Sequence, residues 1–257
     1  MPGEAPLPFS RPSDSPLPPA SAARRRVPTL SFLFWHGIGR LGEALILLPA
    51  ALALSIWLAQ RARGQRMAVQ WLTLVAVAAL LTTATKVAFI GWGVGSATFN
   101  FTGISGHAMF ATAVYPLLLR TLASTSAVYW HRASVLLGYL LALLIGISRV
   151  KLGAHSWSEV FSGWIVGGAA SAIALMLARV PRTTPPRWLL AGVLAWFIAM
   201  PAGAPASPTH GWVTSLALAM SGRDVPYTRR DLYRDARRVN MSIDAPLRAV
   251  GPAPTTR

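Results

Sequence analysis

Apolar runs long enough to cross a bilayer follow one another along this chain, and they constrain its fold more than any other feature. A helix needs about 20 mainly apolar residues to span the hydrocarbon core of a membrane. Such runs predict spanning helices over 41–59, 68–90, 107–120, 134–148, 160–178 and 188–203. The composition agrees, because 53% of the 257 residues are hydrophobic and only 12% are charged. The sequence therefore predicts an all-α, polytopic membrane bundle of about six transmembrane helices.

The segments that flank these runs are mostly polar and basic. Residues 1–28 are rich in Pro, Ser and Arg without apolar periodicity, which predicts a disordered tail. Residues 29–40 are apolar but contain Gly37 and Gly39, so we expect them at the membrane interface or in a re-entrant turn. Residues 204–257 are polar again and carry eight arginines from Arg223 onward, which predicts a basic tail, amphipathic or disordered. The predicted membrane domain is thus 29–203.

The formal net charge of +16 is explained by a membrane rather than by nucleic acid. The arginines lie in the tails and between the apolar runs, where they contact anionic headgroups and set the topology. No nucleic-acid-binding motif is visible. The expected partners are therefore the lipid bilayer and a membrane lipid substrate. Cysteine is absent, which excludes disulfides, iron–sulfur clusters and a cysteine nucleophile.

The short connections between the runs predict the orientation. The connections 60–67, 121–133 and 179–187 are rich in arginine. The connections 91–106 and 149–159 contain only two Lys or Arg residues, Arg149 and Lys151. Basic connections stay in the cytoplasm. The second set is therefore expected on the periplasmic face of a bacterial inner membrane. The two basic tails fit the rule less well, since an even number of spans places both on the outer side.

Ionisable side chains gather at the helix ends on this outer side. They are Lys86, His107, Arg149, His155 and Glu159. Because successive helices reverse direction, all five approach the same membrane face. An ionisable group within a span costs about 2.5–3.5 kcal/mol on insertion scales, so a group of five predicts a functional site.

The residue types suit an anionic, phosphate-like substrate. Lys86 and Arg149 can neutralise phosphoryl oxygens, and the arginine can do so with two parallel bonds. Ser105 can donate its hydroxyl, and the amides of Gly106 and His107 at a helix start can add backbone donors.

A histidine and an acid complete the pattern. His155 and Glu159 are four residues apart and share a face if they lie in one helix, so the carboxylate can bind one imidazole nitrogen while the other faces substrate. An imidazole oriented in this way can attack phosphorus, and His107 can protonate the leaving oxygen.

These residues resemble the motifs of the type 2 phosphatidic acid phosphatases, which share their site with vanadium haloperoxidases. The family pattern is Lys-x6-Arg-Pro, then Pro-Ser-Gly-His, then Ser-Arg-x5-His-x3-Asp. The third motif stands here as SRVKLGAHSWSE, over 148–159, with glutamate in place of aspartate. The second is ISGH, with Ile104 in place of proline. The first keeps Lys86 but has Gly93 and Val94 where Arg-Pro is expected.

The resemblance covers residues 40–180 and implies a membrane lipid phosphatase. It implies His155 as the nucleophile that forms a phosphohistidine, Glu159 as its orienting partner and His107 as the general acid. The phosphate cradle would consist of Lys86, Ser105, Gly106 and Arg149. No metal or other cofactor is implied. The substrate would be phosphatidate, phosphatidylglycerophosphate or an isoprenyl diphosphate.

Other interpretations of the same residues stay open. Ser105 can simply cap a helix, and Lys86 and Arg149 can be charges that flank spans. The stretch Gly103-Ile104-Ser105-Gly106 also fits the Gly-x-Ser-Gly of rhomboid intramembrane proteases, with His155 as the base. A third alternative is a non-catalytic membrane protein that binds lipid phosphate.

Overall fold

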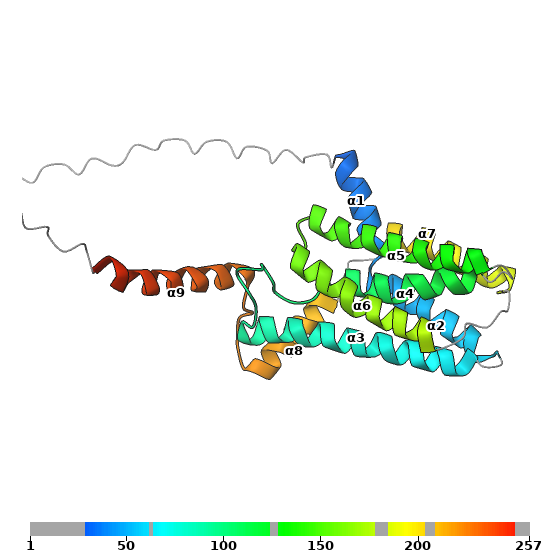
Figure 1. Ribbon diagram of the computed structural model, residues 1–257, viewed down its shortest axis with the longest axis horizontal. Helices are drawn as coiled ribbons and strands as arrows, with labels where there is room; N and C mark the ends of the chain where they lie inside the picture. Colours follow the sequence, from blue (N-terminus) through cyan, green and yellow to red (C-terminus); the bar gives the residue numbers. More distant parts are fainter. Residues whose placement is uncertain (1–28, 62–63, 124–127, 178–184, 204–208, 250–257) are drawn as a thin grey trace, which may run out of the picture.

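A computed structural model describes residues 29–61, 64–123, 128–177, 185–203 and 209–249. The described part is helical, apart from turns and one isolated bridge between Ser96 and Phe101. Its helices are α1 Leu30–Arg40, α2 Ala44–Ala59, α3 Gly64–Trp92, α4 Gly106–Leu122, α5 Val128–Lys151, α6 Trp157–Leu177, α7 Arg187–Gly203, α8 Thr209–Ser221 and α9 Arg229–Ala249 (Figure 1). The predicted tail 1–28 lies outside the described residues.

The predicted all-α membrane bundle is confirmed. Among the described residues, four helical stretches are long and apolar enough to cross a bilayer: Leu30–Ala59, Gly64–Trp92, Tyr129–Lys151 and Trp157–Leu177. Helices also form over the other two predicted spans, but α4 and α7 have only 17 residues each. At 1.5 Å per residue each is about 26 Å long, slightly shorter than the hydrocarbon core. Residues 30–40, expected at the interface, form α1 directly before α2.

Helix α4 lies at the centre of the bundle, where it packs against both α5 and α6. Glycines allow this close approach. A Cβ atom at Gly167 of α6 would lie 2.1 Å from the carbonyl oxygen of Met109 in α4. A Cβ atom at Gly138 of α5 would lie 2.6 Å from the Cα atom of Pro116. Small residues let helix backbones touch in membranes, where burial of apolar surface does not drive association.

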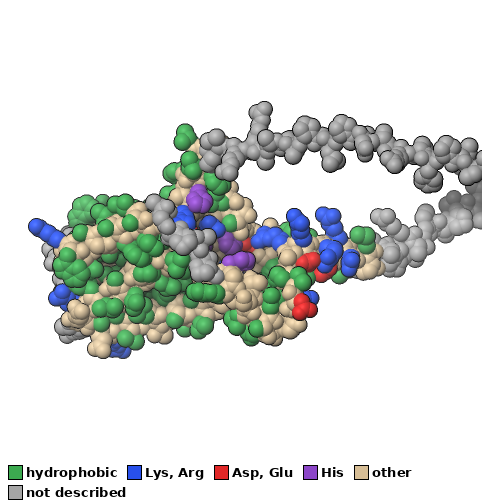
Figure 2. Space-filling view, turned by 180° about the vertical axis from the view of Figure 1, so that it is seen from behind, with side chains coloured by type: hydrophobic (Ala, Val, Ile, Leu, Met, Phe, Trp, Pro, Cys, Tyr) green, Lys and Arg blue, Asp and Glu red, His purple; other side chains and the backbone are tan. Residues whose placement is uncertain are grey.

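Large apolar side chains cover the outside of the bundle, and polar groups lie inside it. Leu80 and Ile165 are each 70% exposed, whereas Ser148 and Glu159 are fully buried. Figure 2 shows hydrophobic side chains over the flank of the bundle, with histidines and basic side chains grouped near the end from which α1 and α9 project. This distribution suits a lipid environment, because an apolar surface of this extent is rare on a soluble monomer.

The C-terminal segment forms two helices in its described part. Helix α8 packs against α3, and α9 extends away from the bundle (Figure 1). The end of α3 and the two helices share a small core of Val87, Phe89, Ile90, Ala217 and Leu232. The domain boundary at 203 stays a prediction, but the chain beyond it is part of the packed structure.

Candidate active site

Five of the predicted site residues line one cavity at the end of the bundle. Lys86 comes from the last turns of α3, Gly106 and His107 from the first turn of α4, Arg149 from the last turn of α5, and His155 from the turn before α6. The cavity has a volume of about 910 Å³. Ligand pockets commonly measure about 300–1,000 Å³. The space therefore admits a substrate headgroup larger than a single phosphate.

His155 and Glu159 form the pair that their spacing predicts. The Nδ1 atom of His155 lies 2.7 Å from Oε2 of Glu159. The ring does not lie in the helix, however, because α6 begins at Trp157. The backbone N–H of Ser156 also donates to Oε2, over 3.2 Å. The contact therefore depends on the turn that precedes α6, in which the carboxylate binds both the ring and the chain beside it.

This pairing sets the chemistry of the imidazole. A carboxylate at Nδ1 favours the proton on that nitrogen, which leaves the lone pair on Nε2. Burial lowers the pKa of His155 below its ordinary value, although the hydrogen bond to Glu159 acts in the opposite direction. The nearby charges of Lys86 and Arg149 also lower this pKa. The ring is therefore neutral near pH 7 and can act as a nucleophile.

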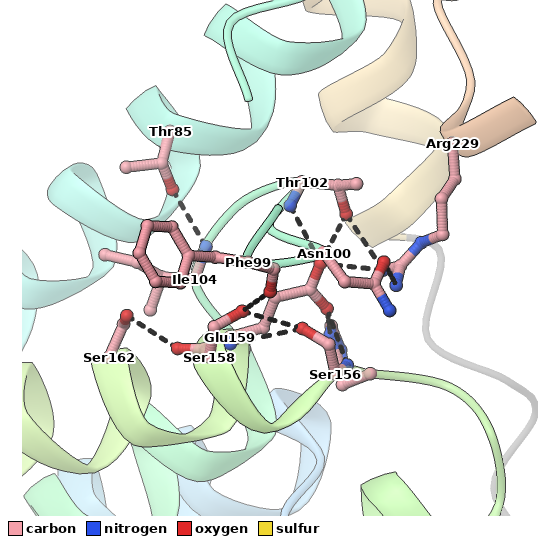
Figure 3. A network of polar contacts seen from close by, with 11 residues as sticks. Thr85, Phe99, Asn100, Thr102, Ile104, Ser156, Ser158, Glu159, Ser162 and Arg229 are labelled. Atoms are coloured by element: carbon pink, nitrogen blue, oxygen red, sulfur yellow. Dashed lines mark hydrogen bonds and ion pairs between the residues drawn. The ribbon is translucent and has the colours of Figure 1, made fainter. Parts of the chain in front are cut away.

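The second carboxylate oxygen of Glu159 binds residues from two other parts of the chain (Figure 3). Oε1 accepts from the backbone N–H of Thr102, over 2.9 Å, and from its hydroxyl, over 2.5 Å. It also accepts from Nη2 of Arg229, over 2.7 Å. Neither Thr102 nor Arg229 was predicted from the sequence. Threonine in a loop carries no such signal, and Arg229 is 70 residues away within a run of arginines.

Lys86 and Arg149 supply positive charge to the cavity. Neither forms a salt bridge with a carboxylate among the described residues. The Nε atom of Arg149 is buried and has no hydrogen-bond partner in the described part of the chain. A buried donor without a partner is costly. The arrangement therefore suits an anion that enters the cavity and accepts these bonds.

Ser105 occupies the N-cap position of α4, but its side chain makes no capping hydrogen bond. Its hydroxyl is fully buried and has no partner within the described ranges. Its backbone N–H donates to the carbonyl oxygen of Glu159, over 3.0 Å, which ties the start of α4 to the start of α6. Ser105 and Glu159 thus lie behind the cavity wall, next to Gly106 and His155.

The rest of the wall contains residues that the sequence did not predict. His36 from α1 and His210 from α8 line the cavity, together with Arg40 and Glu43, whose side chains form a 3.4 Å ion pair. In the part of the chain that the structure describes, no three His, Asp or Glu side chains group closely enough to bind a metal ion. Lysine and arginine side chains outnumber carboxylates in the cavity wall, so the site is mainly cationic and suited to a phosphate group.

Comparison with known proteins agrees with these motifs. The family model of the PAP2 superfamily matches residues 85–183, which contain all seven predicted site residues. The chain is also similar to an "Uncharacterized 22.5 kDa protein in cps region" of Klebsiella pneumoniae, with 36% identity over 209 residues that cover 79% of this chain and 99% of that protein. No solved structure matches. The chain therefore belongs to the PAP2 superfamily, a membership that supports a phosphatase-type activity.

Proposed function

We propose that the protein hydrolyses a phosphate monoester or diphosphate of a membrane lipid through a phosphohistidine at His155. The observation that carries this proposal is the pair between His155 Nδ1 and Glu159 Oε2, at 2.7 Å, beside a cavity lined by Lys86 and Arg149. The pair prepares a nucleophile, and the two cations can hold the group that it attacks.

The first step transfers the phosphoryl group to the enzyme. The Nε2 lone pair of His155 attacks phosphorus, and the bond from phosphorus to the lipid oxygen breaks. His107 donates a proton to the departing oxygen, so the lipid leaves as a neutral alcohol, or as a monophosphate if the substrate is a diphosphate. Glu159 keeps the Nδ1 proton and balances the positive charge that develops on the ring.

The second step releases phosphate. His107, now without its proton, removes a proton from water, and the resulting hydroxide attacks phosphorus. The bond between phosphorus and Nε2 breaks, which restores the neutral ring of His155 and the protonated ring of His107. Lys86 and Arg149 neutralise the phosphoryl oxygens in both steps, and the backbone amides of the first turn of α4 can add further donors.

The surroundings of the cavity support a lipid as the substrate. The cavity lies at the end of a bundle whose flank is apolar (Figure 2), so a phosphate headgroup can enter while its chains stay in the bilayer. By the distribution of basic connections, we place the cavity on the periplasmic face of a bacterial inner membrane.

Phosphate release from solubilised lipids tests this function. Full-length protein in detergent is expected to release inorganic phosphate from at least one of phosphatidate, phosphatidylglycerophosphate and an isoprenyl diphosphate. Vanadate, which mimics phosphate in the transition state, should inhibit the reaction. A serine-reactive fluorophosphonate should leave Ser105 unlabelled, because that hydroxyl is fully buried. Vanadate-insensitive protein labelled at Ser105 would instead favour a protease, and phosphate binding without turnover would favour a binding protein.

The pH dependence gives a second test. The attacking ring must be neutral and the ring of His107 must be protonated. The rate is therefore lost as the pH falls through the pKa of His155, and it is lost again as the pH rises through the pKa of His107. Because burial lowers the pKa of His155 below 6.5, the acidic midpoint of the kcat/KM profile is expected below pH 6.5. Two substrates whose own phosphate pKa values differ should give the same midpoint. A midpoint above pH 6.5 that is common to both would contradict the neutral buried ring.

A further inference from the structure

The segment after α8 is fixed against the end of α3. The backbone N–H of Tyr227 donates to the carbonyl oxygen of Ile90, over 2.9 Å. The ring of Tyr227 packs edge-to-face on Phe89, with centroids 5.5 Å apart. Leu232 is buried in the small core shared with α3. These contacts place the first residue of α9, Arg229, beside the cavity.

The guanidinium of Arg229 binds three oxygen atoms from two segments (Figure 3). Nη2 donates to Oε1 of Glu159, over 2.7 Å, and to Oγ1 of Thr102, over 3.1 Å. Nη1 donates to Oδ1 of Asn100, over 2.6 Å. The Glu159 side chain is fully buried, whereas that of Arg229 is 36% exposed. A buried carboxylate requires a counter-charge, and Arg229 provides it.

Gly93 lies directly under the docked ring of Tyr227. The first motif of the family has arginine there, whereas this chain has Gly93, with φ of +74°. A Cβ atom at this position would lie 3.2 Å from the ring of Tyr227. A side chain at 93 would therefore crowd the docked tyrosine, and the left-handed backbone there would strain any residue other than glycine. The segment that occupies this space brings its own guanidinium, two residues later, to the wall of the same cavity.

We propose that Arg229 is a positioning residue of the active site, which holds the Glu159 carboxylate, balances its charge and thereby keeps the His155 ring neutral and oriented toward the cavity. The expected effect of Arg229 on turnover rests on the proposed function. Its expected effect on the pKa of His155 does not depend on that function.

The charges around His155 predict what the loss of Arg229 does. The groups that face the ring, or act on it through Glu159, come from five elements: Lys86 of α3, His107 of α4, Arg149 of α5, Glu159 of α6 and Arg229 of α9. Glu159 is the acidic group among these five, while Glu43, which also lines the cavity, is paired with Arg40. Without Arg229 the negative charge of Glu159 acts on the imidazole with less opposition, while Thr102 and Ser156 still hold the carboxylate in place. The pKa of His155 is therefore expected to rise.

The test is an NMR titration of His155 in full-length, histidine-labelled protein in detergent. Arg229→Gln is expected to raise the pKa of His155 and to lower kcat at least about tenfold, the loss typical of a charged hydrogen bond. Arg229→Lys should keep the pKa of His155 and the kcat close to their wild-type values. The matched control is Arg230→Gln, which changes the exposed neighbouring arginine and should titrate and turn over like the wild type.

Asn100→Gly provides a milder variant. It removes one acceptor of Arg229 but suits the left-handed backbone at this position, where φ is 52°. Asn100→Gly should raise the pKa of His155 as Arg229→Gln does, by a smaller amount. If the glutamine variant does not fold, this variant provides the test. Titration curves of folded Arg229→Gln, or failing that of Asn100→Gly, that coincide with the wild-type curve would overturn the proposal. Wild-type protein without turnover would count against the proposed function, while the titration still decides the role of Arg229.

Discussion

His155→Ala is expected to lower kcat by about ten-thousandfold or more, the largest effect of any single substitution in the cavity. Loss of a nucleophile that forms a covalent intermediate removes the reaction path itself, and effects of this size are typical. Lipid binding should persist, because Lys86 and Arg149 remain in the cavity wall. The measurement is phosphate release under saturating substrate, together with rapid quenching to detect phosphoprotein. The wild type should show a label that is stable in alkali and labile in acid, as phosphohistidine is.

The matched control is His131→Ala. His131 lies near the start of α5, at the opposite end of that helix from Arg149, and is not part of the cavity wall. This variant should keep the wild-type rate and the phosphoprotein label. Turnover by His155→Ala within tenfold of the wild type would exclude the covalent mechanism, whatever the substrate.

Gly167→Ala is expected to lower the free energy of unfolding by about 3 kcal/mol. The added Cβ atom would lie 2.1 Å from the carbonyl oxygen of Met109 and 2.3 Å from Oγ1 of Thr112. The carbonyl belongs to the backbone of α4 and cannot move away without moving the helix, whereas the Thr112 hydroxyl can rotate. Helices α4 and α6 must therefore separate. Because these helices also carry His107 and Glu159, activity should fall together with the thermal midpoint measured in detergent.

Gly168→Ala is the control for this pair. It lies one residue further along the same helix, and a Cβ atom there meets nothing within 4 Å. Alanine is the better helix former by about 1 kcal/mol, so this variant should be as stable as the wild type or slightly more stable. Equal thermal midpoints for the two variants would contradict the close packing of α6 against α4 at Gly167.

Local patterns made much of this site predictable from the sequence. The apolar runs predict the helices, and the alternation of helix directions predicts that Lys86, Arg149 and His155 meet at one end. The interval between His155 and Glu159 predicts their contact, although the ring lies in a turn rather than in the helix. These inferences depend on residue spacing within one or two helical turns or on the direction of a helix. The pattern of apolar and polar residues in the sequence predicts each of these.

The parts that the sequence did not predict depend on contacts between distant segments. Arg229 is one of eight arginines from Arg223 onward, and its neighbours in the sequence do not set it apart. The docking of Tyr227 against Gly93, which brings Arg229 to the cavity, is visible in the structure alone. His36 and His210 reach the cavity because α1 and α8 pack at its rim. Thr102 binds Glu159 because the loop before α4 folds back through the bridge between Ser96 and Phe101. No periodicity encodes such a loop.

The ion pair between Arg229 and Glu159 also determines when the site can be completed during protein synthesis. A ribosome translates Glu159 long before Arg229, after which α7 and α8 must still be made. Until then the nascent chain carries an inward-facing acid without its guanidinium counter-ion. The cavity can therefore reach its final electrostatic state only after the chain has been made as far as Arg229 and has folded back onto the bundle.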